Sequence, residues 1–136
     1  MMTEAERRNS NYDTKLFHEM MDTIKRLDWS STCGVKDMIA YGWEYEYNEG
    51  LVDETPHYTR YEEDVIRFKK GDDVIQINLS TGTVVIQDLS DTFCYGAPTI
   101  FILPKEMMAI AKILSTIDTI KNCAESRLCQ DTEIML

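Results

Sequence analysis

The apolar residues of this chain repeat with a helical period near both ends and with a period of two in the middle. In residues 12–28 the apolar residues recur every three or four positions, which predicts an amphipathic helix. The segment that begins at Pro104 repeats in the same way, and proline suits the first turn of a helix. Any fold for this sequence must therefore join two terminal helices to a β-rich centre.

Short β-branched and aromatic runs fill the centre of the chain. Residues 43–47 alternate aromatic and acidic side chains, and residues 58–69 form a second extended segment whose alternation slips at 62–64, where a bulge would fit. The turns KKGDD and LSTGT separate VIRF, VIQINL and TVVIQ, and TIFI at 99–102 is a candidate last strand. We predict an α+β fold, an antiparallel meander of four to five strands with an N-terminal and a C-terminal helix packed on one face.

Length and composition are those of one domain. The chain has 136 residues, 43% of them hydrophobic, and shows no linker or repeat. We expect a single domain over 1–136 with frayed ends at about 1–10 and 126–136. No apolar run approaches the roughly 20 residues that cross a bilayer, and the start is charged. We therefore expect a cytoplasmic protein without membrane contact.

Residues suited to metal binding or catalysis are few and scattered. Cys33, Cys94, Cys123 and Cys129 lack the paired spacing of a zinc site, and in an intracellular chain they are expected to be free, packed thiols. His18 is expected to meet Asp22 on a helix surface, His57 has no substrate site beside it, and Cys94 has no identifiable base. We expect no metal, no cofactor and no catalytic residue, and hence no enzyme.

The negative charge of the chain is concentrated in one stretch. The formal net charge is −10, and residues 44–64 contribute −7 through eight acids and one base, Arg60. If 43–47 is a strand, Glu44 and Glu46 share one face about 6.6–6.8 Å apart, while the aromatic face packs on the core. Acids held in this way complement a basic groove with little ordering on binding.

The acidic hairpin is therefore the candidate partner-binding surface, in which tyrosines supply hot-spot contacts. The predicted partner-binding residues are Glu44, Glu46, Glu49, Asp53, Glu54, Tyr58, Tyr61, Glu62, Glu63 and Asp64. This surface would repel nucleic acid, so we expect no direct nucleic-acid binding. The expected partner is a basic protein such as a nucleic-acid-binding enzyme.

Several interpretations of this stretch stay open. It could be a solvated edge that keeps the protein soluble. It could instead belong to a small acidic inhibitor that mimics nucleic acid, similar in kind to phage anti-defence proteins of the anti-CRISPR or anti-restriction type, or to immunity proteins that neutralise basic toxins. A pocket near Arg60, Arg67, Lys69 and Lys70 could alternatively sequester a nucleotide or other small molecule. The sequence does not decide the oligomeric state.

Overall fold

The computed structural model describes the backbone of residues 4–50, 52–54, 56, 59–61, 63–88 and 102–134, and side chains within 15–50, 56, 63–88 and 102–129. Its elements are α1 (Glu4–Arg26), the 3₁₀ helix η1 (Trp29–Ser31), α2 (Cys33–Ala40), β1 (Glu44–Asn48), β2 (Val52–Glu54), β3 (Thr59–Tyr61), β4 (Val65–Lys70), β5 (Asp73–Asn78), β6 (Val84–Asp88) and α3 (Pro104–Ile134). The predicted α+β class is confirmed.

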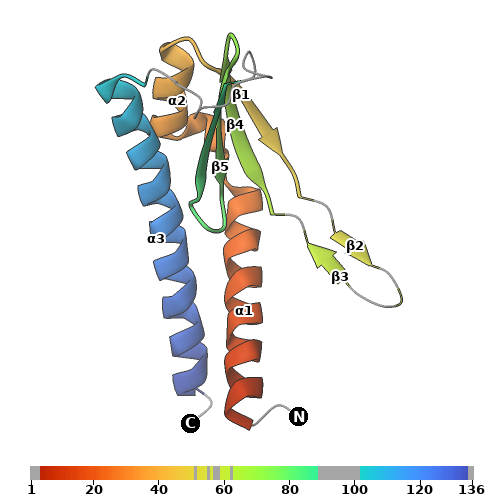
Figure 1. The fold of residues 1–136 in the computed structure, drawn as a ribbon. Helices are drawn as coiled ribbons and strands as arrows, with labels where there is room; N and C mark the ends of the chain where they lie inside the picture. Colours follow the sequence, from red (N-terminus) through yellow and green to blue (C-terminus); the bar gives the residue numbers. More distant parts are fainter. Residues whose placement is uncertain are drawn as a thin grey trace.

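The strands form a sheet and a separate arm. β1, β4, β5 and β6 make a four-stranded antiparallel sheet in that order, and β2 pairs with β3 in a two-stranded ribbon. We call β2 and β3 the arm, which projects away from the helices in Figure 1.

The arm continues the β1–β4 hairpin in the same register. Asn48 pairs with Val65 at the end of the sheet, and Val52 pairs with Tyr61 at the start of the arm. Three residues separate these two pairs on each strand, so no residue is inserted, and within the described residues the pairing is interrupted at 49–50 and 63–64. The bulge expected at 62–64 is therefore not what interrupts the alternation.

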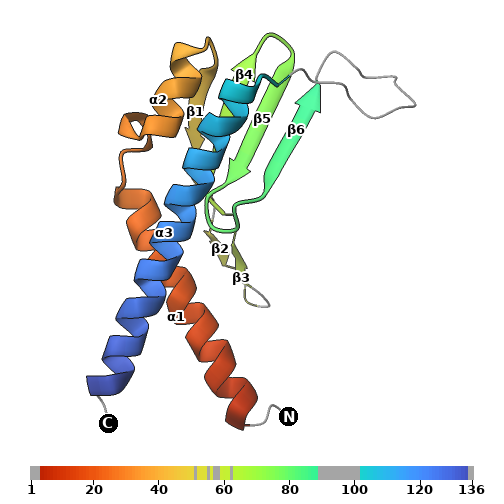
Figure 2. The same cartoon turned by 90° about the vertical axis from the view of Figure 1, so that its left-hand side faces the viewer.

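One hydrophobic core joins the helices to the sheet. α1 and α3 run side by side in opposite directions, and α3 passes across the sheet in the view of Figure 2. Core residues exposed by 1% or less come from every layer: Ile24 of α1, Met38 of α2, Phe68 of β4, Ile75 of β5 and Ile113 of α3. The expectation that both terminal helices pack on one sheet face stays a prediction.

The terminal helices are longer than the sequence analysis predicts. α1 begins at Glu4 and α3 reaches Ile134, so the ends expected to fray are helical over 4–10 and 126–134. The candidate strand at 99–102 lies almost wholly outside the described residues.

A short helix, α2, was not predicted. Its buried residues Val35 and Met38 span little more than one turn, too short a window for a helical period to stand out. α2 packs closely on α3 through Gly34, because a Cβ at this position would lie 2.6 Å from the carbonyl oxygen of Ala109 and 2.7 Å from Cγ1 of Ile113. Glycine is therefore required by the approach of two helices.

Gly34→Ala should destabilise the protein although alanine is the better helix former. Helix propensity alone favours alanine by about 1 kcal/mol, but the added methyl group meets the backbone of α3. We expect the free energy of unfolding, measured by chemical denaturation, to fall by about 1–3 kcal/mol. The exposed Lys36→Ala in the same helix is the control and should change this free energy by less than about 0.5 kcal/mol. An unchanged or raised value for Gly34→Ala would contradict the packing.

Candidate partner-binding site

β1, the strand that carries the first predicted acids, lies between two buried carboxylates. Asp64 is 1% exposed and Glu106 is 2% exposed, and they are the buried charged side chains in the described part of the chain. Burial of a carboxylate is costly unless hydrogen bonds compensate for the lost water. The donors to these two groups therefore show what each one holds in place.

Glu106 anchors the start of β1. The indole N–H of Trp43, the residue before β1, donates to Oε2 of Glu106, and the backbone N–H of Leu103 donates to Oε1 at 2.8 Å. Leu103 directly precedes α3 and Glu106 is the third residue of that helix, so the second bond is one half of a capping box. A single carboxylate thus caps α3 and positions the entry to β1.

Asp64 anchors the end of β1. Both of its carboxylate oxygens accept hydrogen bonds from Lys25 Nζ at 3.2 Å, and the carboxylate also accepts from the backbone N–H of Gly50 at 2.8 Å and from the Tyr47 hydroxyl. Its backbone carbonyl accepts from the Leu79 N–H at 3.0 Å. We call Asp64, Lys25, Tyr47 and Gly50 the Asp64 cluster, which connects α1 to both strands of the hairpin.

The burial of Asp64 corrects the predicted site. A side chain that is 1% exposed has no surface to offer a partner. Glu63 is half-buried and accepts a hydrogen bond from the side-chain amide of Asn78, while Glu62 lies outside the described residues. Two of these three consecutive acids therefore have structural partners, which a pattern of acidic letters does not reveal.

The exposed acids of β1 lie beside an equally exposed basic row. Glu44 and Glu46 are exposed, as the alternation predicts, but the register places Lys69 opposite Glu44 and Arg67 opposite Glu46. Directly opposed residues share one face of a sheet. The basic row thus lies one strand spacing, about 4.8 Å, from the acidic row. We call these four residues the charged face.

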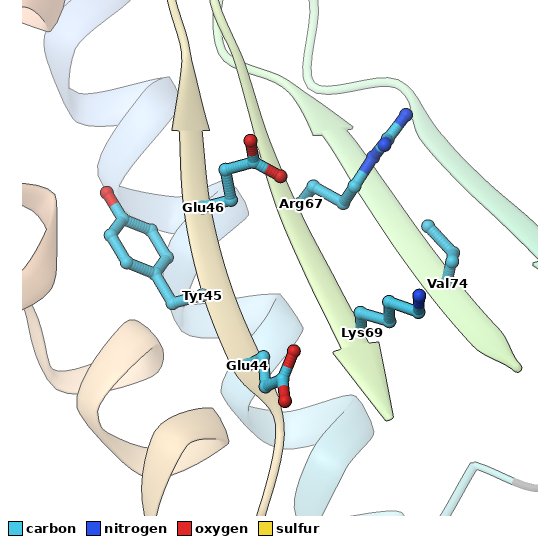
Figure 3. Close-up of a pocket in the computed structure, with 6 residues that line it drawn as sticks. All are labelled: Glu44, Tyr45, Glu46, Arg67, Lys69 and Val74. Atoms are coloured by element: carbon cyan, nitrogen blue, oxygen red, sulfur yellow. The ribbon is translucent and has the colours of Figure 1, made fainter. Parts of the chain in front are cut away.

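A hollow of about 410 Å³ opens on the charged face, and its lining also includes Val74 and Tyr45. Figure 3 shows Val74 on the same side of the strands as the charged side chains, with Tyr45 directed to the other side. Val74 is 3% exposed and gives the hollow an apolar floor. In the basic row, Nη2 of Arg67 donates to Oε1 of Gln76 at 3.2 Å. Both signs of charge around an apolar floor suit the mixed side chains of a protein surface.

Three other predicted partner-binding residues, Asp53, Glu54 and Tyr61, lie on the arm. Glu49 is exposed, Asp53, Glu54 and Tyr61 are described in their backbone only, and Tyr58 lies outside the described residues. Asp53 pairs with Arg60 in the arm, so an acid again stands opposite a base. Over residues 44–70, eight acids accompany four bases, and the net charge is −4.

The basic row was missed because charge was counted along the chain. The register of the interrupted hairpin is symmetric about the midpoint between positions 56 and 57, and positions equally distant from this midpoint pair with each other. Pairing outward from this midpoint would have placed bases beside Glu44 and Glu46. Glu106 had a signal as well, because a glutamate two residues after Pro104 suits the third position of a helix.

The described thiols and histidine lie on helices α1, α2 and α3, whereas the charged face lies on β1 and β4. Cys33, Cys123 and Cys129 are free and exposed, so the prediction that they are packed is wrong. His18 is exposed on α1, with its ring edge-on to Phe17 at 6.0 Å between centroids. Cys94 and His57 lie outside the described residues. Within the described residues, no group of three His, Cys, Asp or Glu side chains could hold a metal ion.

Of the residues considered for a nucleotide pocket, the structure describes the side chains of Arg67, Lys69 and Lys70. Arg67 and Lys69 stand opposite carboxylates, and Lys70 Nζ donates to the carbonyl oxygen of Tyr41 at 3.1 Å. A negatively charged ligand in the hollow would meet both glutamates of the acidic row. Sequestration of a nucleotide or other small molecule stays an alternative prediction.

Comparison with protein-family models, with curated proteins and with solved structures gave no match for this chain. None of the helices in the described ranges is long and apolar enough to cross a membrane. The function has to be inferred from the charged face and the groups that hold it.

Asp64→Asn should lower the free energy of unfolding by about 2–3 kcal/mol, because hydrogen bonds to a charged group contribute about 1.5–3 kcal/mol and the amide cannot accept at both positions. Lys25 is 46% exposed and can return to water, which limits the loss. Chemical denaturation measures the change. Asp37→Asn, which breaks the exposed ion pair with Lys112, is the matched control and should cost less than about 1 kcal/mol. Equal losses for both would contradict a special role of Asp64.

Two tyrosines of β1 should ionise only at high pH. Burial raises the pKa of Tyr45, and burial followed by the hydrogen bond to Asp64 raises the pKa of Tyr47. Their folded-state pKa values lie above the unfolded value of about 10, so this contribution to stability is complete below about pH 10 and declines as the pH rises further. Tyrosinate absorbance should show tyrosines that ionise at higher pH in the folded chain than in the denatured chain, and Tyr47→Phe should reduce this difference. If the folded and denatured chains ionised over the same pH range, the prediction would be contradicted.

Proposed function

We propose that this chain is a non-enzymatic binding protein whose charged face engages a basic protein partner. The observation that carries the proposal is the acidic row of Glu44 and Glu46 in register with the basic row of Lys69 and Arg67. Rows of opposite sign define an orientation, because a partner pairs correctly with both rows in one alignment and meets like charges in the reverse one.

The buried groups that hold β1 in place favour binding by the charged face. Glu106 and Asp64 hold the two ends of β1, and Tyr45 and Tyr47 pack against the core between them. Side chains on such a strand lose less freedom on association than side chains on a loop, so more of the interaction energy remains as affinity.

The positive charge expected of the partner follows from the net charge of the whole chain and from the edge position of β1. The formal charge of −10 attracts a positive surface, and the attraction acts over a screening length of about 8 Å at physiological salt. β1 is an edge strand of the sheet, so the acidic row is the outer row. A basic partner surface is drawn to this acidic edge first, and acidic side chains of the partner then pair with the inner basic row.

The charge pattern differs from that of a nucleic acid. Phosphates along a strand carry one sign of charge, whereas the rows alternate in sign across neighbouring strands. We therefore propose recognition by paired rows in place of phosphate mimicry. Nucleic-acid-binding enzymes and basic toxins stay within the proposed partner class, because both offer extended basic surfaces.

Exchanging the two rows should abolish partner binding without changing net charge. The variant Glu44→Lys, Glu46→Lys, Arg67→Glu, Lys69→Glu keeps every cross-strand pair opposite in sign and keeps the formal charge at −10. In a quantitative pull-down with a salt gradient, we expect basic proteins on the native bait and at least tenfold less on the exchanged bait. Four contacts of about 0.5 kcal/mol each are sufficient for that factor.

The matched control exchanges the exposed Asp37–Lys112 pair between α2 and α3, which also leaves net charge unaltered. This control should retain the same proteins as the native chain. Equal capture by native and row-exchanged baits would contradict the proposal and support the interpretation of the acids as a solvated edge. Thermal melting of all three chains verifies that each is folded.

A further inference from the structure

We propose that the Asp64 cluster is a locked joint that fixes the angle between the arm and the four-stranded sheet. The arm and β1–β4 belong to one hairpin in one register, but within the described residues the strand pairing between them is interrupted at 49–50 and 63–64. A hairpin bends most readily where ladder hydrogen bonds are missing, because local opening there breaks the fewest contacts.

Asp64 lies at this lapse and replaces the missing ladder with side-chain bonds. The Gly50 N–H crosses from the opposite strand to Oδ1 at 2.8 Å, and the Tyr47 hydroxyl reaches the same carboxylate from β1. Lys25 Nζ then connects this carboxylate to α1 at 3.2 Å. Both strands at the base of the arm are thereby bonded, through one buried group, to the body of the protein.

The consequence for binding rests on the proposed function. With the joint locked, the arm and the charged face form one surface, and the arm pair of Asp53 and Arg60 keeps a fixed position relative to the two rows. With the joint open, the arm moves by itself and a partner has to order it on binding, which lowers affinity. Asp64 is buried and touches no partner, so it acts here as a positioning residue.

A joint and a general structural support give different signatures. If Asp64 only stabilises the domain against global unfolding, removing one of its donors accelerates exchange in the slow core and leaves the arm at its native rate. If it also locks the joint, the same change accelerates exchange in the arm. Hydrogen–deuterium exchange separates these two outcomes, because it reports opening segment by segment.

The experiment compares Tyr47→Phe with Tyr45→Phe in the full chain. Both variants remove one hydroxyl from a half-buried tyrosine on the same face of β1, and the Tyr47 hydroxyl is the one bonded to Asp64. In Tyr47→Phe we expect exchange over 52–54 and 59–61 to rise about tenfold, as for the loss of one hydrogen bond. Tyr45→Phe should leave the arm at its native rate.

Lys25→Met is a second variant, which removes the bond from α1 and retains the aliphatic stem. It should also accelerate exchange in the arm. Equal arm exchange in the Tyr47 and Tyr45 variants would overturn the joint, and so would arm exchange that stays at the native rate in both Tyr47→Phe and Lys25→Met. Hydrogen–deuterium exchange requires no partner, so it tests the joint by itself. The proposed function is tested separately, by the pull-down with the row-exchanged variant.

Discussion

The hydrogen bonds that Glu106 and Asp64 accept at the two ends of β1 are the interactions on which the charged face depends. Trp43 donates at one end and Tyr47 at the other, so the strand is fixed by groups that lie outside its ladder. Each carboxylate also binds a second element, the start of α3 or the side chain of Lys25 on α1. The position of the surface acids is therefore set by buried acids.

Charge in this protein serves two separate purposes. Buried carboxylates organise the backbone, and each is matched by donors that offset the loss of water. Exposed charges form ordered rows, in which each acid of β1 has a base beside it on β4. Under the proposed function, the overall negative charge would guide a partner over a distance, whereas the rows would act at contact, where the order of signs would distinguish one partner from another.

The sequence predicts the parts of the fold that depend on local pattern. The class, the strands of the sheet and the exposure of Glu44 and Glu46 follow from hydrophobic periods of 3.6 and 2. The pairing partners depend on register across residues distant in sequence, so Arg67 was not placed beside Glu46. The role of Asp64 was missed for a related reason, because burial of an acid depends on donors from α1 and β1 that come together on folding.

The order of charges also protects the hairpin against misfolding. A slip of one residue between β1 and β4 would bring Glu44 opposite Phe68 and force either a charge into the core or an aromatic ring into water. A slip of two residues would preserve at most one of the two oppositely charged pairs. The rows therefore discriminate between alternative strand alignments as the chain folds, and the same side chains that we assign to recognition of a partner first ensure that the strands recognise each other correctly.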